Sequence, residues 1–123
     1  MKAILLSNNE NDLKRVYTHQ EVAMIQSLFD CDGIYRTDAE LTDTDVIFST
    51  WGMPKLTEAQ IREKLPSLKA VFYGAGTVKP FAQPFLNCGV RIFSAWQANA
   101  VPVAEFTVAQ VLLANKVGRL YRH

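Results

Sequence analysis

Short apolar runs that alternate with helix-forming segments are the feature that most limits the fold of this chain. Each run is three or four residues long and is bounded by turn-forming residues, as expected for strands of a parallel sheet covered on both faces. The runs are Ala3–Leu6, Gly33–Tyr35, Val46–Phe48, Ala70–Tyr73 and Val90–Phe93. Strands joined by helical crossovers predict an open, doubly wound α/β sheet of about five parallel strands with helices on both faces.

A capping box at Thr18 and Glu21 predicts the first crossover helix, from about Gln20 to Phe29. In a capping box the threonine hydroxyl accepts a hydrogen bond from the N–H three residues on, and the glutamate reaches back. Apolar residues then recur at helical spacing. They are Val22, Ile25, Leu28 and Phe29.

Similar signals predict two more helices inside the sheet region. Thr57 to Gln60 repeats the capping signature, and Pro66 ends that helix because proline lacks a backbone donor. A third helix is expected over Pro80–Leu86, although it contains a proline, with Asn87 and Gly89 as its stop.

A long C-terminal helix is predicted from Pro102 to about Lys116, because proline is favoured at the first helical position. This segment has almost no polar face, so it must be buried on all sides. We favour a helix that lies between this domain and a partner or further domain; the alternative is a central helix of this same domain. Its apolar residues are Val103, Ala104, Phe106, Val108, Ala109, Val111, Leu112, Leu113 and Ala114.

The charge balance argues against nucleic-acid and membrane partners. Thirteen basic and twelve acidic residues give a net charge of +1, without runs of one sign, so no field attracts an anionic polymer or surface. No apolar stretch approaches the roughly 20 residues of a membrane span, and no signal-peptide pattern follows Met1 and Lys2. We therefore expect a cytoplasmic protein.

The cysteines and histidines form no recognisable metal or catalytic site. Cys31 and Cys88 lie in different segments, with no nearby histidine to complete a metal site, and are expected to be free and partly buried. His19 falls in an expected first helical turn, and His123 is the last residue. Neither is placed like a catalytic base.

No dinucleotide fingerprint is present in the sequence. Such a site needs a strand, then G-x-G-x-x-G, then a helix, so that the backbone can approach the pyrophosphate. The nearest match is Gly74-Ala75-Gly76, but Lys79 stands where the third glycine belongs. We therefore expect that this chain alone binds neither NAD nor NADP.

Several motifs occur in an order that is informative together. The segment Ser67–Gly76 combines a strand with a Gly-x-Gly turn, Gly89–Phe93 forms a second strand, and Asn99 precedes Val103–Glu105 by four residues. In this order the chain resembles the D-isomer-specific 2-hydroxyacid dehydrogenases over most of Val46–Lys116. The first forty residues are merely compatible with that family.

The resemblance implies a flavodoxin-like substrate-binding domain in residues 1–100 and an interdomain helix in residues 101–123. An NAD-binding domain would follow, so the chain would be the substrate-binding part of an NAD(P)-dependent oxidoreductase that interconverts D-2-hydroxy acids and 2-keto acids. The family's catalytic arginine, glutamate and histidine lie beyond the nucleotide fingerprint, so we expect no catalytic residue in this chain. Independently of the resemblance, the apolar helix is expected either to pair with its counterpart in a second copy, giving a homodimer, or to fold back over its own sheet.

The resemblance also implies a substrate site. The loop matching Tyr73 to Thr77, which includes Gly74, Ala75 and Gly76, would present backbone N–H groups to the substrate carboxylate. A glycine-rich turn at the end of a parallel strand suits an anion, although a tight turn that simply needs two glycines has the same sequence. Where the family usually has an acidic residue after this turn, the chain has Thr77-Val78-Lys79, so the loop geometry is expected to differ.

Four further positions are implied by the same resemblance. Trp51 and Gly52 follow the third strand and would border the substrate pocket with an aromatic wall; simple packing is the alternative. Asn99 and Val103 match positions near the domain hinge that touch the cofactor; helix capping and core packing are their alternatives.

A second class of function stays open. A family relative that has become a non-catalytic binding or assembly module would have the same sheet. A phospho-receiver needs an aspartate at the end of the third strand, where this chain has Ser49-Thr50, and a flavodoxin needs a phosphate loop after the first strand. The segment after that strand, Ser7 to Asn11, has no glycine.

Overall fold

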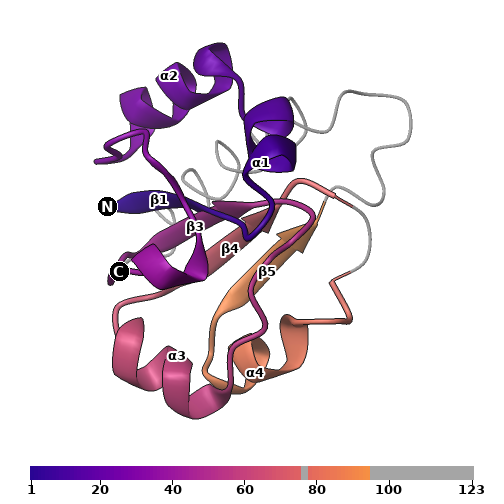
Figure 1. The fold of residues 1–123 in the computed structure, drawn as a ribbon. Coiled ribbons are helices and arrows are strands. Elements are labelled where there is room, and N and C mark those ends of the chain that lie inside the picture. Colours follow the sequence, from indigo (N-terminus) through magenta and orange to yellow (C-terminus); the bar gives the residue numbers. More distant parts are fainter. Residues whose placement is uncertain (76–77, 95–123) are drawn as a thin grey trace.

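The computed structural model describes residues 1–75 and 78–94 and contains a five-stranded, all-parallel sheet (Figure 1). The strand order is β2-β1-β3-β4-β5, the order of flavodoxin-like doubly wound sheets. This confirms the expected α/β class and the five strands. Their bounds are β1 Ala3–Leu6, β2 Tyr35–Arg36, β3 Val46–Ser49, β4 Ala70–Tyr73 and β5 Arg91–Ser94.

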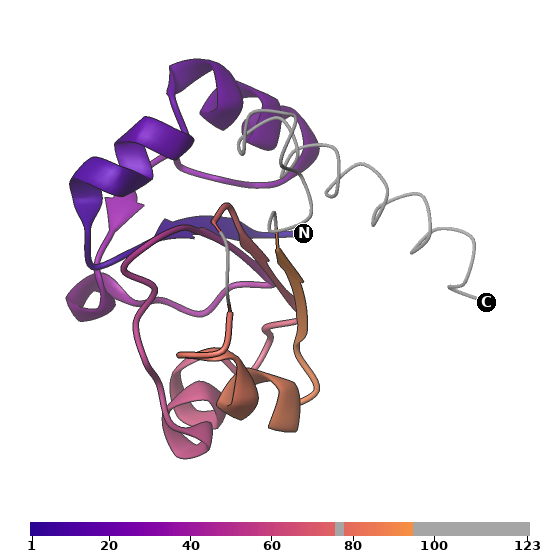
Figure 2. The same cartoon turned by 90° about the vertical axis from the view of Figure 1, so that its right-hand side faces the viewer.

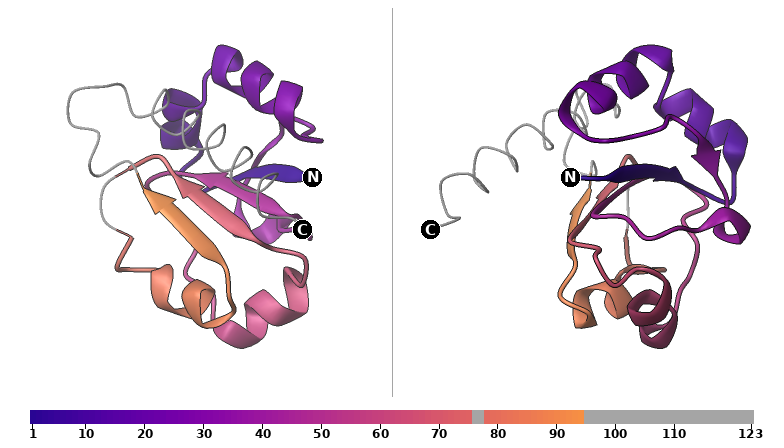
Figure 3. Two further views of the ribbon diagram at one scale, coloured as in Figure 1. Left: turned by 180° about the vertical axis from the view of Figure 1, so that it is seen from behind. Right: turned by 90° about the vertical axis from the view of Figure 1, so that its left-hand side faces the viewer.

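Helices cover both faces of the sheet (Figures 2 and 3). Helices α1, Glu10–Val16, and α2, His19–Leu28, lie on one face. Helices α3, Glu58–Lys64, and α4, Ala82–Asn87, lie on the other. The connection from β2 to β3 contains only a short 3₁₀ helix, η1, Asp38–Glu40.

Side chains of each strand alternate between two apolar clusters, one on each face. Ile4, Ile47 and Val71 pack toward α3 and α4, whereas Leu5 and Phe48 pack toward α1 and α2. Alternation of this kind is the two-residue repeat of a strand with both faces buried. It explains why the strands read as continuous apolar runs.

Helix α1 is absent from the sequence-based expectation, which placed a single helix before β2. Its apolar contacts come from only Leu13 and Val16, so it has no longer apolar repeat that predicts a helix. These two buried side chains pack the helix on the sheet. Asn9 caps it by accepting a hydrogen bond from the Asp12 amide at 3.3 Å.

One of the two expected capping boxes is wrong. Thr57 accepts from the Gln60 amide at 3.2 Å while the Gln60 side chain accepts from the Thr57 amide at 3.0 Å, so that box is confirmed. Thr18 precedes α2, but its hydroxyl donates to the Glu21 carboxylate instead of accepting from the backbone. The two side chains that should have capped the helix therefore bond each other.

The remaining element boundaries differ only slightly from expectation. Gly33 and Ile34 precede β2 rather than belonging to it, since Gly33 has φ +75°. Pro84 is tolerated in α4 because it is the third helical residue, where the N–H has no intrahelical partner. The expected helix from Pro102 to Lys116 and the domain boundary at residue 100 lie outside the described residues.

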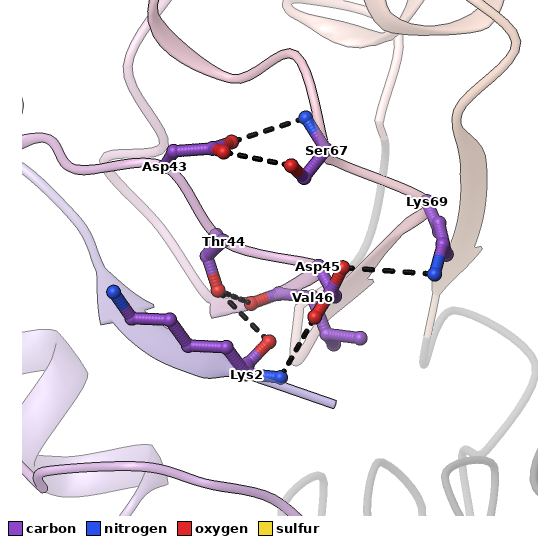
Figure 4. A network of polar contacts seen from close by, with 7 residues as sticks. All are labelled: Lys2, Asp43, Thr44, Asp45, Val46, Ser67 and Lys69. Carbon is purple, nitrogen blue, oxygen red and sulfur yellow. Dashed lines mark hydrogen bonds and ion pairs between the residues drawn. The ribbon is translucent and has the colours of Figure 1, made fainter.

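Polar contacts join the strand starts at the amino edge of the sheet (Figure 4). Asp45 accepts from the Lys2 amide at 2.8 Å and lies 3.6 Å from the Lys69 ammonium, and so it links the starts of β1, β3 and β4. Asp43 accepts from the amide and hydroxyl of Ser67 at 3.1 and 2.7 Å, and hydrogen bonding by that hydroxyl lowers its carboxyl pKa. This edge is therefore braced, and the opposite, carboxyl edge carries the candidate site.

Within the described residues, no helix combines the length and the apolar character needed to cross a membrane.

Candidate functional site

The candidate site lies at the carboxyl edge, where the ends of β1, β3 and β4 meet. The chain runs from β1 outward to β2 on one side and then crosses to β3 on the other, so the order reverses between β1 and β3. Ligands of open α/β sheets bind in the crevice at such a switch point. The register pairs Phe48 with Leu5 and Ser49 with Tyr73, so the three strands end nearly level.

Hydrogen bonds tie the loop after β1 to the loop after β3. The buried Ser7 hydroxyl donates to the Trp51 carbonyl at 2.6 Å and accepts from the Asn9 amide at 3.0 Å. The Asn8 amide donates to the Gly52 carbonyl at 2.7 Å. The two loops are therefore held as one unit across the switch point.

Gly52 is required by this close approach. Its φ of +87° is a conformation that side chains disfavour. A Cβ at this position would lie 2.8 Å from the Ser7 hydroxyl oxygen and 2.9 Å from the Asn9 backbone nitrogen. The glycine thus lets the loop after β3 lie directly on the start of α1.

Trp51 presents its side chain to solvent. It is 50% exposed, whereas Met53, two residues later, is buried in the cluster beneath α3 and α4. The indole is not packed in the core, in contrast to the packing alternative. An exposed aromatic ring at a sheet's carboxyl edge can form an apolar wall against a bound molecule.

The described start of the turn after β4, Gly74 and Ala75, is buried rather than open. Tyr73 packs its ring against Phe81, with ring centroids 4.8 Å apart, and burial raises the pKa of its hydroxyl. The Gly74 amide donates to the Ser49 carbonyl at 2.7 Å, and Ala75 is buried. Because one N–H makes one strong hydrogen bond, a carboxylate at this edge would need donors other than the Gly74 amide.

A tyrosine that the sequence analysis did not single out supports this edge from below. Tyr17, the residue after α1, is buried and donates its hydroxyl to the Ser49 carbonyl at 2.8 Å. In the sequence Tyr17 stands at helical spacing with Leu13 and Val16, a short pattern that was a usable signal for its burial. The polar triplet Ser7-Asn8-Asn9 was also missed, although its place directly after a strand is a usable signal.

The described residues do not fit a dinucleotide. A pyrophosphate needs free backbone N–H groups in a glycine-rich turn that opens a helix. The turn from Ser7 to Asn9 has no glycine, and the Gly74 amide is engaged by Ser49. The expected cofactor contacts Asn99 and Val103, and the substrate contact Gly76, lie outside the described residues.

The described residues also hold no group of three His, Cys, Asp or Glu side chains arranged to bind a metal ion.

A shallow groove of about 230 Å³ lies at the opposite, amino edge of the sheet, between α3 and the start of β5. Leu68 and Val90, which precede β4 and β5, form part of its floor. It is therefore remote from Trp51 and the switch point. Its lining residues are Ile61, Arg62, Leu65, Pro66, Leu68, Cys88 and Val90.

Comparisons of the chain with protein-family models, with curated proteins and with solved structures found no match. The resemblance to the 2-hydroxyacid dehydrogenases rests on the sequence motifs.

Proposed function

We propose that this chain is the substrate-binding part of an NAD(P)-dependent oxidoreductase that interconverts D-2-hydroxy acids and 2-keto acids. One observation carries the proposal. Trp51–Gly52 and the turn that begins at Gly74, to which the resemblance assigns the substrate site, follow β3 and β4, adjacent strands in which Ser49 pairs with Tyr73 at the carboxyl edge beside the switch point. Motifs about 20 residues apart in sequence therefore belong to one ligand-binding edge.

In this proposal the chain binds and orients a small 2-hydroxy or 2-keto acid. Trp51 forms an apolar wall, and the turn that begins at Gly74 follows the neighbouring strand. Hydride transfer requires a nicotinamide, which a separate nucleotide-binding domain would hold, and a base to take the hydroxyl proton. The 123-residue chain alone is therefore proposed to be inactive and to bind no NAD or NADP.

Amide chemical shifts of labelled protein during titration with pyruvate test the site. We expect the largest shifts at Trp51–Met53 and Tyr73–Thr77. Trp51→Ala should weaken binding, whereas Leu86→Ala, which shortens a similarly exposed side chain on α4, should not. Largest shifts outside these two segments would refute the site assignment. Saturable micromolar binding of NAD, measured by calorimetry, would refute the proposal that this chain alone binds no NAD.

A second candidate is a non-catalytic binding or assembly module derived from the same family. The hydrogen bond from the Gly74 amide to the Ser49 carbonyl, 2.7 Å long, favours this candidate, because that N–H is then not available to a substrate carboxylate. A folded protein that shows no shift with either pyruvate or glyoxylate would support this candidate against the first.

We also propose a homodimer. The proposal rests on the apolar residues between Pro102 and Lys116, which lie outside the described residues. Sedimentation compares the wild type with the double variant Phe106→Glu and Leu112→Glu. A wild-type dimer that becomes a folded monomer supports pairing through this segment, and a wild-type monomer contradicts it.

A cytoplasmic location belongs to the same proposal. Cys31 and Cys88 are free thiols and are partly buried, as expected from the sequence. Burial raises the pKa of the Cys31 thiol and disfavours its reactive thiolate. Thiol titration of protein isolated under native conditions should find both cysteines reduced; an intermolecular disulfide would argue for an oxidising compartment.

A further inference from the structure

Tyr17 connects the α1 side of the domain to the candidate site. The residue caps the C-terminus of α1, and its side chain is fully buried. Its hydroxyl donates to the Ser49 carbonyl at 2.8 Å and lies 3.3 Å from the Phe72 carbonyl. Ser49 ends β3 and Phe72 belongs to β4, so one phenol reaches two strands just beneath their carboxyl ends.

The Ser49 carbonyl accepts two hydrogen bonds, from different parts of the domain. It accepts from the Tyr17 hydroxyl at 2.8 Å and from the Gly74 amide at 2.7 Å. Gly74 is the first residue after β4, and Trp51 follows Ser49 by two residues. The direction of this one carbonyl therefore relates the loop that carries Trp51 to the turn that begins at Gly74.

Tyr17 is itself held at both ends. Its ring packs edge-on against Phe48, with centroids 6.0 Å apart. Its backbone carbonyl accepts from the Tyr35 hydroxyl at 2.7 Å. A buried hydroxyl that lost its acceptor would carry a desolvation cost, so the hydrogen bonds to the Ser49 and Phe72 carbonyls favour this position of the phenol.

We infer that Tyr17 is a positioning residue of the carboxyl-edge site: its hydroxyl orients the Ser49 carbonyl and thereby sets the Gly74 turn against the Trp51 loop. The effect on a ligand rests on the proposed function. The effect on the free protein does not.

The test compares Tyr17→Phe with Tyr35→Phe. Each variant deletes one tyrosine hydroxyl that donates to a backbone carbonyl, but only the Tyr17 hydroxyl touches Ser49. In the free protein, we expect Tyr17→Phe to shift the Gly74 amide resonance and to speed its hydrogen exchange about two- to tenfold relative to the core amide of Leu5. Tyr35→Phe, which removes only the hydrogen bond to the Tyr17 backbone carbonyl, should change that ratio less than Tyr17→Phe does.

Pyruvate titration supplies the ligand readout. We expect Tyr17→Phe to weaken pyruvate binding about two- to tenfold, the factor equivalent to one lost hydrogen bond, and Tyr35→Phe to weaken it less. An unchanged Gly74 shift and exchange ratio in Tyr17→Phe, or an equal change in Tyr35→Phe, would overturn the inference whatever happens to global stability. If Gly74 responds as expected but the wild type binds no pyruvate, the positioning role stands and the proposed substrate is wrong.

Discussion

A methyl group added to Gly52 would lie 2.9 Å from the backbone nitrogen of Asn9, closer than a Cβ normally approaches. The Asn8 amide, one residue earlier, donates to the Gly52 carbonyl at 2.7 Å. The loop after β3 therefore rests on the residue that caps α1, without room for a side chain. At the switch point, the loop after β3 therefore contacts the loop that follows β1.

We expect Gly52→Ala to destabilise the protein by about 2 to 4 kcal/mol, because backbone strain at positive φ adds to the overlap with Asn9. Gly89→Ala is the matched control. Its φ is also positive, at +79°, but a Cβ there meets nothing within 4 Å, so a loss of about 1 kcal/mol is expected. Urea unfolding measures both; equal losses would show that the contact with Asn9 is unimportant.

The two threonine caps should respond differently to truncation. Thr57→Ala removes a hydroxyl that accepts from the Gln60 amide and should cost about 1 kcal/mol. Thr18→Ala removes a hydroxyl that bonds only the exposed Glu21 side chain among the described groups, so we expect less than about 0.5 kcal/mol. Thermal or urea unfolding distinguishes them, and a larger loss for Thr18→Ala would contradict the observed capping geometry.

The aromatic stack across three strands should be most sensitive at its inner end. Phe48 stacks on Phe72 with centroids 5.3 Å apart, and Phe72 stacks on Phe93 at 4.9 Å. Phe48 is fully buried, whereas Phe93 on the outer strand β5 is half-buried. We expect Phe48→Leu to cost about 1 to 3 kcal/mol and Phe93→Leu less than about 1 kcal/mol in urea unfolding. A larger loss for Phe93→Leu than for Phe48→Leu would contradict the observed burial of Phe48.

The ion pair between Asp32 and Arg36 predicts a pH dependence of stability. Two hydrogen bonds of 2.9 and 2.6 Å from the Arg36 guanidinium lower the carboxyl pKa of Asp32 to about 2. A lowered carboxyl pKa stabilises the folded state above the ordinary value near 4, and this stabilisation is lost as the pH falls from about 4 to about 2. Because the Asp32 side chain is 46% exposed, we expect only about 1 kcal/mol.

The variant Asp32→Asn tests this dependence. It should be less stable than the wild type by about 1 kcal/mol at pH 7, and the difference should shrink as the pH approaches 2. Glu63→Gln, on the exposed surface of α3 and without an ion pair among the described residues, is the control. A difference for Asp32→Asn that persists at pH 2 would contradict the assigned cause of the pKa shift.

Much of the fold was predictable because its signals are local. The apolar runs located the five strands within one or two residues, since a strand buried on both faces needs a short continuous apolar stretch. Thr57 and Pro66 marked the limits of α3 for the same reason. Helix α1 was missed because its apolar pattern spans little more than one turn, and the Thr18 box failed because its side chains bond each other.

The candidate site was predictable only in outline. A turn that follows a parallel strand must lie at the carboxyl edge, and the pairing of Ser49 with Tyr73 puts the loops after both strands at that edge. Their role as a substrate site stays a prediction. Whether the Gly74 amide is free or engaged depends on the direction of the Ser49 carbonyl. That direction is a property of the packed sheet.

The sequence by itself determined the strands, most of the helices and the parallel α/β class, because apolar periodicity, caps and proline act within a few residues. Only the tertiary structure decided that Tyr17 would meet Ser49 and Phe72, which lie 32 and 55 residues further along the chain. Such a meeting depends on the strand order and on the face that α1 covers. A buried hydroxyl without a hydrogen-bond partner raises the free energy of the folded state, so its partners are set by which polar groups lie nearby in the packed sheet.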